Sequence, residues 1–146
     1  MKEKIFHVNY IIDGILSVIP TKIIFEKLNE DELQSIHFEL DLGNRQFVSN
    51  SSNVAELAIV NFQQILSSNI NIACCESCRY GNFCPYGDNE NEIFCFKYVS
   101  FSNKMDVCDF FSNNIYPEDR IRRLLDYCAD YKTITNEYYT YNDWKL

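Results

Sequence analysis

The chain has 146 residues and carries 13 Lys and Arg against 21 Asp and Glu, which gives a formal net charge of −8. This length predicts one domain, because domains usually run to roughly 100–200 residues. A hydrophobic content of 47 % excludes a disordered chain. The acidic balance argues against nucleic acid and anionic membrane as partners, since both require basic surface. No stretch reaches the roughly 20 apolar residues that span a bilayer.

The first half of the sequence predicts an antiparallel sheet. Apolar and β-branched runs recur between turn signals at residues 4–12, 15–19, 22–28, 35–42 and 45–49. Asp13-Gly14 between the first two runs is a strong hairpin signal, because Gly tolerates positive φ. The run 35–42 alternates apolar with polar side chains, so we expect one buried and one solvent-facing side. The apolar set is Ile36, Phe38, Leu40 and Leu42, and the polar set is His37, Glu39 and Asp41.

A helix is predicted at residues 53–68, which carry a broad apolar stripe at helical spacing. Asn53 would cap this helix, and Glu56 stands three positions later, as in a capping box. Short strands are predicted at residues 70–75 and 92–99, on either side of several cysteines.

A second helix is predicted to begin near Pro117, because proline suits the first helical position. Its apolar stripe comprises Ile121, Leu124, Leu125 and Cys128, at i, i+3, i+4, i+7 spacing. Ion pairs Glu118–Arg122 and Asp119–Arg123 would lie on its outer side. This pattern assigns Cys128 to the core.

The chain contains seven cysteines, an odd number that internal disulfides cannot fully pair. The first residues are charged and then apolar, but His7, Asn9 and Asp13 interrupt the apolar run and no small-residue cleavage site follows. We therefore expect no signal peptide. A cytoplasmic protein is predicted, in which clustered cysteines usually indicate metal binding or reactivity rather than disulfides.

A metal site is the chemistry that the cysteine spacing favours. Cys75 and Cys78 form a C-x-x-C pair, whose spacing lets two thiolates point at one metal ion. A tetrahedral zinc needs two more ligands. The preferred pair is Cys95, in a predicted strand, and Cys108, just after a predicted loop. Cys84 could replace either of them.

Two observations limit this interpretation. A zinc ribbon or a rubredoxin-like iron site would carry two C-x-x-C pairs, and only one is present, so zinc is favoured over iron. Free cysteines also serve as small buried side chains. Cys74 is assigned to packing, because it would share a strand face with Ile70 and Ile72.

The segment from Cys75-Glu-Ser-Cys78-Arg-Tyr80 through Cys95-Phe96 to Cys108-Asp-Phe110 resembles small bacterial four-cysteine proteins of unknown function. Those proteins combine a C-x-x-C pair, a later single cysteine in a strand and a final cysteine followed by an aromatic residue. The resemblance covers roughly a quarter of the chain. It implies a metal site at Cys75, Cys78, Cys95 and Cys108, and no activity.

Catalytic chemistry finds little support. A thioredoxin-like C-x-x-C begins a helix, but Gly81, Pro85 and Gly87 follow here and prevent a long one. The histidines, His7 and His37, lie in predicted strands, and His37 beside Glu39 is interpreted as solvent-facing rather than as a catalytic base. No Gly-x-Ser-x-Gly turn, phosphate-binding loop or His-Glu-x-x-His helix is present. We predict no catalytic residues.

Aromatic side chains crowd the end of the chain: Tyr127, Tyr131, Tyr138, Tyr139, Tyr141 and Trp144. Covering the core is the favoured interpretation, since aromatics dominate cores. A partner surface is the alternative, because Tyr and Trp are enriched at binding hot spots.

The sequence thus predicts an α+β protein with an antiparallel sheet packed by two helices and a cysteine-rich insertion. The single domain 1–146 would comprise sheet and helix (1–72), the cysteine-rich segment (73–112) and a C-terminal helix with an aromatic tail (113–146). The leading hypothesis is a non-enzymatic binding protein with a structural zinc and a protein partner. An immunity-type inhibitor of a basic protein, by analogy with other small acidic proteins, and a thiol-redox protein are the alternatives.

Overall fold

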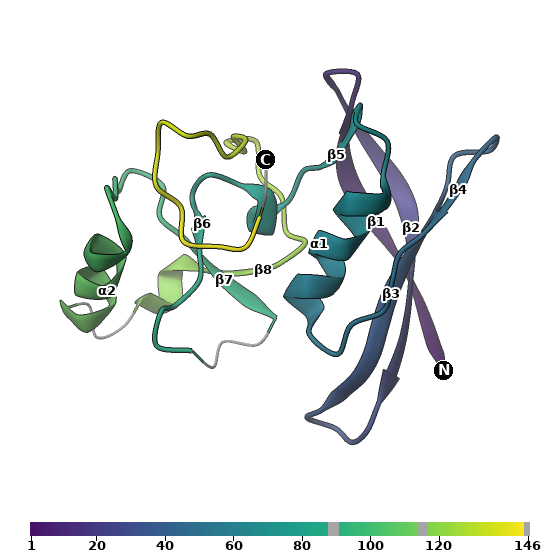
Figure 1. Ribbon diagram of the computed structural model, residues 1–146, viewed down its shortest axis with the longest axis horizontal. Coiled ribbons are helices and arrows are strands. Elements are labelled where there is room, and N and C mark those ends of the chain that lie inside the picture. The colour runs from purple at the N-terminus through teal and green to yellow at the C-terminus, as the bar shows by residue number, and fades with distance from the viewer. Residues whose placement is uncertain (88–90, 114–116, 145–146) are drawn as a thin grey trace. The chain divides into compact units, whose positions relative to one another are not determined.

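The computed structural model describes residues 1–87, 91–113 and 117–144. The chain divides into two compact units, Met1–Ile72 and Ala73–Leu146. All seven cysteines follow this boundary, so the first unit contains none. Each unit combines an antiparallel sheet with one α-helix, which confirms the α+β class (Figure 1). Over the described residues, no helix is both long and apolar enough to span a membrane.

The first unit is a five-stranded sheet in the order β4-β3-β2-β1-β5, with helix α1 against one face (Figure 1). Its elements are β1 (Lys2–Ile12), β2 (Ile15–Lys27), β3 (Leu33–Asp41), β4 (Gln46–Val48), α1 (Ala55–Ile65) and β5 (Ile70–Ile72). Asp13 and Gly14 have φ of 51° and 81° and form the predicted tight turn between β1 and β2.

Strand β2 is longer than predicted, since the runs 15–19 and 22–28 join into one strand across Pro20. Pro20 lies opposite His7 of β1, and pairing with β3 begins only at Lys22. A proline lacks the N–H that a ladder needs, so it is tolerated where one side of a strand is unpaired. Pro20 therefore does not interrupt the strand.

The core of the first unit lies between the sheet and α1. Phe62 of α1 stacks on Phe38 of β3 with 5.2 Å between ring centroids, and it meets Tyr10 of β1 edge-on with 6.4 Å between ring centroids. The predicted sides of β3 are confirmed, because Phe38 and Leu40 are buried. Val54, rather than the predicted Asn53, occupies the N-cap position of α1, and it makes no side-chain capping bond.

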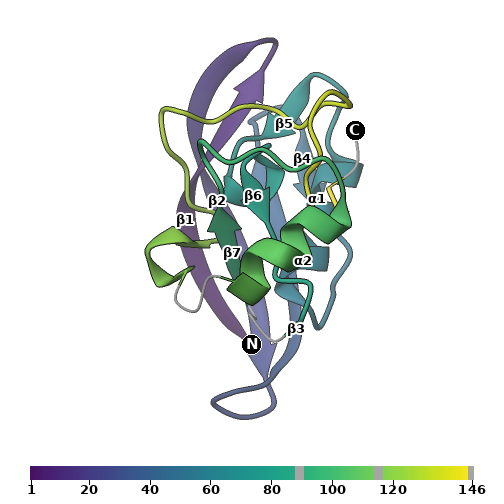
Figure 2. The same ribbon diagram turned by 90° about the vertical axis from the view of Figure 1, so that its left-hand side faces the viewer.

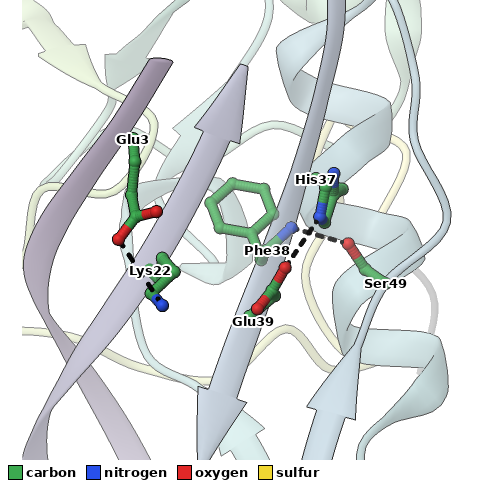
Figure 3. A network of polar contacts seen from close by, with 6 residues as sticks. All are labelled: Glu3, Lys22, His37, Phe38, Glu39 and Ser49. Atoms are coloured by element: carbon green, nitrogen blue, oxygen red, sulfur yellow. Dashed lines mark hydrogen bonds and ion pairs between the residues drawn. The ribbon is translucent and has the colours of Figure 1, made fainter. Parts of the chain in front are cut away.

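The other side of β3 carries a polar network, drawn in Figure 3. His37 Nε2 lies 3.1 Å from Glu39 Oε2, and Lys22 Nζ of β2 lies 3.5 Å from Glu3 Oε1 of β1. The main-chain N–H of Phe38 donates to Ser49 Oγ at 2.8 Å, which fastens the chain beyond β4 to β3. Lys22 and Glu3 thus form a polar pair across neighbouring strands, whereas His37 and Glu39 are two residues apart on one face of β3.

The second unit contains a three-stranded sheet in the order β6-β7-β8 and helix α2 (Figure 2). Its elements are the 3₁₀ turn η1 (Cys75–Ser77), β6 (Gly81–Asn82), β7 (Glu92–Cys95), α2 (Lys104–Asn113), the 3₁₀ turn η2 (Pro117–Arg120) and β8 (Ile121–Arg123). Phe94 and Phe96 meet Phe110 and Phe111 of α2 in edge-to-face contacts at 4.9–5.5 Å. These rings form the centre of an aromatic core.

Helix α2 was not predicted. Asn103 Oδ1 accepts the N–H of Asp106, and Asp106 Oδ2 accepts the N–H of Ser102, so the two side chains cap the helix reciprocally. Val107, Phe110 and Phe111 then follow at i, i+3, i+4 spacing and face the aromatic core. Both signals are present in the sequence.

The predicted helix after Pro117 is wrong. Residues Pro117–Arg120 form one 3₁₀ turn, and Ile121–Arg123 pair antiparallel with β7 as strand β8. Arg122 donates to the main-chain carbonyls of Asp119 and Ile121 instead of reaching along a helix toward Glu118. The apolar spacing that suggested a helix therefore belongs to a strand and the turn that follows it.

Two predicted strands end earlier than expected. Strand β5 stops at Ile72, and the chain enters η1 at Cys75. Strand β7 stops at Cys95, because Tyr98 adopts a φ of 71° and the N–H of Val99 closes a turn onto the carbonyl of Phe96. Among the C-terminal aromatic residues, Tyr139 and Tyr141 pack against the aromatic core as expected, whereas Tyr138 is exposed beneath Arg79.

Candidate metal centre

The C-x-x-C pair lies on a tight turn, here called the knuckle (Cys75–Cys78). The N–H groups of Ser77 and Cys78 return to the carbonyls of Cys74 and Cys75 at 3.0 and 3.3 Å. Cys74 precedes the turn and is fully buried, which confirms its assignment to packing. Burial, followed by the nearby charge of Glu76, raises the pKa of the Cys74 thiol to about 12.

Gly81 brings strand β7 against the knuckle. A Cβ at this position would lie 2.1 Å from the carbonyl oxygen of Cys75, so only glycine permits the observed approach. Gly81 is also the register partner of Cys95 in the β6–β7 pair. Cys95 is thereby placed beside the knuckle by main-chain geometry alone.

The chain beyond β8, here called the C-terminal segment (residues 124–144), is bonded to the same turn. The N–H of Cys75 donates to the carbonyl of Asp126 at 2.7 Å, and that of Arg79 donates to Lys132 at 2.8 Å. Cys78 and Thr133 form an isolated antiparallel bridge. Cys128 lies between these attachment points and is exposed, so its predicted place in the core is wrong.

The thiols of the knuckle interact with those of the other two segments. Burial raises the pKa of Cys75 well above its usual range, and the charges of Cys74, Cys78, Asp126 and Cys95 add to the effect. Burial also raises the pKa of Cys78, main-chain hydrogen bonds from Lys132 and Tyr80 lower it, and the charges of Cys95 and Cys128 raise it further. The knuckle thiols therefore share an electrostatic neighbourhood with Cys95 and Cys128.

The structure places Cys108 and Cys84 in different surroundings. Cys108 is on α2, where its carbonyl accepts a hydrogen bond from the Tyr86 hydroxyl at 3.4 Å. The pKa of Tyr139 is raised by burial and then by the charges of Tyr141 and Cys108. Cys84 packs against the aromatic core. Of the predicted ligands, Cys75, Cys78 and Cys95 thus lie on adjoining main-chain segments, while Cys84 packs against the aromatic core and Cys108 lies on the helix that covers it.

The main-chain segments that carry the candidate cysteines lie next to one another, but their side chains do not form a ready-made metal site. Across residues 1–87, 91–113 and 117–144, no group of three or more His, Cys, Asp or Glu side chains is arranged closely enough to hold an ion. To share one ion, the thiols would have to come closer together and lose their protons. Thiolate sulfur is the donor that zinc accepts in structural sites.

The histidines play no part in this arrangement. His7 and His37 are both in the first unit, which contains no cysteine. His7 is exposed on β1, and His37 pairs with Glu39 (Figure 3). Within either unit, therefore, no cysteine has a histidine beside it to act as a base.

Comparisons of the chain with protein-family models, with curated proteins and with solved structures give no match.

Proposed function

We propose that this chain is a non-enzymatic binding protein whose second unit is stabilised by a structural zinc ion. Cys75, Cys78 and Cys95 would be three of the ligands, and a further cysteine would complete a tetrahedral thiolate set. The observation that carries the proposal is the convergence of the knuckle, β7 and the C-terminal segment through main-chain bonds and the close approach of Gly81. Each of these three segments contributes cysteine.

A structural ion would fill a clear need in the second unit. Its strands have only two to four residues, and its 3₁₀ turns have three and four. Short elements supply little cooperative main-chain stability, and small domains often add a metal for this reason. Zinc, when bound, would contribute its binding free energy to folding, because an unfolded chain offers no assembled site.

Thiol-redox chemistry is less well supported. A redox cysteine needs a lowered thiol pKa, which a helix N-terminus or a neighbouring cation supplies. Burial instead raises the pKa of both Cys75 and Cys78. Such thiols stay protonated near neutral pH and are weak nucleophiles unless a metal ion removes the proton.

A protein partner is favoured by the sheet face opposite α1. The β1–β2 register places Ile5, Leu16 and Val18 on this face, and their exposed fractions are 53, 48 and 57 %. Apolar side chains exposed together are typical of binding surfaces. The inhibitor hypothesis, in which an acidic protein neutralises a basic partner, stays a prediction that the net charge of −8 motivates.

Metal content measured together with a thiol count tests the zinc proposal. The full chain would be purified under reducing conditions without added zinc, and metal would be determined by mass spectrometry. We expect about one zinc per chain. After mild denaturation, the metal should protect four of the seven thiols, and the other three, which include the buried Cys74, should react with a thiol reagent. Sub-stoichiometric metal with seven reactive thiols would refute the proposal.

A further inference from the structure

We propose that Cys128 is the fourth ligand of the centre, so that Cys75, Cys78, Cys95 and Cys128 form one thiolate site; this inference rests on the proposed zinc function. It differs from the set that sequence spacing favours, in which Cys108 completes the site.

Cys128 lies between two main-chain hydrogen bonds that join the C-terminal segment to the knuckle and the residue after it. Two residues before it, the carbonyl of Asp126 accepts the N–H of Cys75 at 2.7 Å. Four residues after it, the carbonyl of Lys132 accepts the N–H of Arg79 at 2.8 Å. The loop between these bonds closes on itself, because the N–H of Tyr131 donates to the carbonyl of Cys128 at 3.0 Å. The main chain at Cys128 is therefore held beside the knuckle.

The chain just after Cys128 also pairs directly with the knuckle. Cys78 and Thr133 form an isolated antiparallel bridge, and Nε of the neighbouring Arg79 donates to the carbonyl of Thr133 at 3.2 Å. The segment that carries Cys128 is thus already paired with one of the other three proposed ligands.

The packing of Cys128 and Cys108 also differs. Its side chain is exposed, so apolar packing does not account for its place. Cys108, by contrast, lies on α2 beside the aromatic core, with Tyr86 bound to its carbonyl and Tyr139 within its electrostatic reach. Moving Cys108 to the knuckle would require α2 to separate from Phe96, whereas the loop that carries Cys128 is already bonded to the knuckle segment on both sides.

The assignment gives zinc a specific task in the fold. Three ligands would come from the knuckle and β7, and the fourth from the C-terminal segment. Through its coordination bonds, the ion would therefore link the C-terminal segment to the sheet of the second unit. Asn142 already joins the same parts, because its Nδ2 donates to the carbonyls of Glu76 and Gly81 at 3.1 and 2.9 Å.

Cobalt(II) titration of the reduced, metal-free full chain tests the assignment. Tetrahedral thiolate coordination of cobalt gives strong visible bands, together with a near-ultraviolet charge-transfer absorption that grows with the number of sulfur ligands. The parent is compared with Cys128→Ser, Cys128→His, Cys108→Ser and Cys84→Ser. We expect parent-like spectra from the last two variants. Cys128→Ser should lose about a quarter of the charge-transfer intensity, since one of four thiolates is removed.

The same titration measures affinity. Cys128→Ser should bind cobalt more weakly by at least the roughly 10–100-fold that losing an outer-shell partner costs. Cys128→His should restore tight binding with a shifted spectrum, because imidazole also binds tetrahedral metal. A variant that merely failed to fold would not regain binding in this way.

The outcomes separate the two proposals. A parent chain that binds no cobalt refutes the zinc function and this inference together. A parent that binds cobalt, with Cys128→Ser unchanged and Cys108→Ser impaired, refutes only the assignment of Cys128.

Alkylation of the unmodified chain supplies a second readout without substitutions. With zinc added, iodoacetamide labelling of Cys128 should fall sharply, while labelling of Cys84 and Cys108 should not change. Labelling of Cys128 that is equal with and without zinc would overturn the assignment, since metal-bound thiolate is shielded.

Discussion

Replacement of Gly81 by alanine should destabilise the second unit even without metal. The added Cβ would lie 2.1 Å from the main-chain oxygen of Cys75 and 3.0 Å from Ile93 Cδ1. Reaching the shortest separation that real Cβ atoms show, 3.0 Å, needs a shift of about 0.9 Å from the Cys75 oxygen. The Ile93 side chain can yield, but the Cys75 oxygen belongs to the main chain of the knuckle, so β6 itself must move.

Two opposing effects set the magnitude for Gly81→Ala. Overpacking of this kind costs about 1–3 kcal/mol. Because φ at Gly81 is not positive, alanine also stiffens the unfolded chain and returns about 0.4–1 kcal/mol. We therefore expect a net loss of about 1–2 kcal/mol. Urea unfolding followed by Trp144 fluorescence in the presence of a chelator measures this difference in the second unit.

Gly87→Ala is the matched control for Gly81→Ala. Gly87 has a φ of 88°, and nothing lies within 4 Å of the place that a Cβ would take, so its replacement tests backbone strain without any clash. Replacing Ile93 by valine in the Gly81→Ala background should restore little, since the Cys75 contact remains. A Gly81→Ala protein as stable as the parent would show that the knuckle and β6 are not packed as described. In the same variant cobalt affinity should also fall, because Cys95 pairs with residue 81.

Substitutions at Asn142, Tyr131 and Phe62, two of them with a matched second variant, test other contacts. Asn142→Ala removes the donor to the carbonyls of Glu76 and Gly81 and should lower the free energy of unfolding by about 1–3 kcal/mol. The isosteric Asn142→Asp should cost more, because its carboxylate would face both carbonyls. Equal free energies of unfolding for the two variants would contradict this geometry. Burial raises the pKa of Tyr131 from 10.0 to about 12, so the unfolded chain ionises first and stability falls as pH rises through this window, by at most about 2–3 kcal/mol. Tyr131→Phe should lack that loss, and parallel pH profiles of parent and variant would exclude it. Phe62→Ala, in the core between the sheet and α1, should lower the free energy of unfolding by about 3–5 kcal/mol. Leu57→Ala, at an exposed position of the same helix, should lower it by about 0.5 kcal/mol or less. Similar shifts in melting temperature for the two variants would argue against this core.

The first unit follows from its sequence because its local signals agree with one another. Alternation in β3, positive-φ residues at Asp13 and Gly14, and the apolar stripe of α1 all specify the same sheet and helix. The differences are small and have local causes. The sequence predicts two separate runs at 15–19 and 22–28, although the unpaired side of β2 tolerates Pro20 between them. Asn53 was expected to cap α1, although Val54 holds that position.

The second unit is harder to predict from its sequence, because the spacing of its apolar residues does not match its strand pairing. Ile121, Leu124 and Leu125 have helical spacing, yet β7 already presents a free edge that residues 121–123 satisfy with main-chain bonds. Spacing within a segment cannot reveal a partner that lies some 30 residues away. Helix α2 is not predicted, although its cap at Asn103 and its apolar stripe from Val107 are both present in the sequence.

The candidate centre shows the same limit. Spacing predicts that the C-x-x-C pair and Cys95 approach one another, and the structure places them on adjoining segments, because a turn and a returning strand can be recognised locally. The position of Cys128 depends on the C-terminal segment, whose attachment uses main-chain carbonyls of Asp126 and Lys132 that no side-chain pattern encodes. The helix predicted after Pro117 assigns Cys128 to a buried stripe, whereas the structure exposes it on the C-terminal segment.

The two units reach stability by different means, and this contrast explains why only one of them would need an ion. The first buries large side chains such as Tyr10, Phe38 and Phe62 between a long sheet and a helix. The second has a compact aromatic core at α2, but its knuckle and C-terminal segment are connected mainly by hydrogen bonds, including that of Asn82 Oδ1 with the N–H of Tyr141. Each such bond contributes only about 1 kcal/mol net. A thiolate-bound zinc would strengthen that region because its ligands come from both of the parts that these bonds connect.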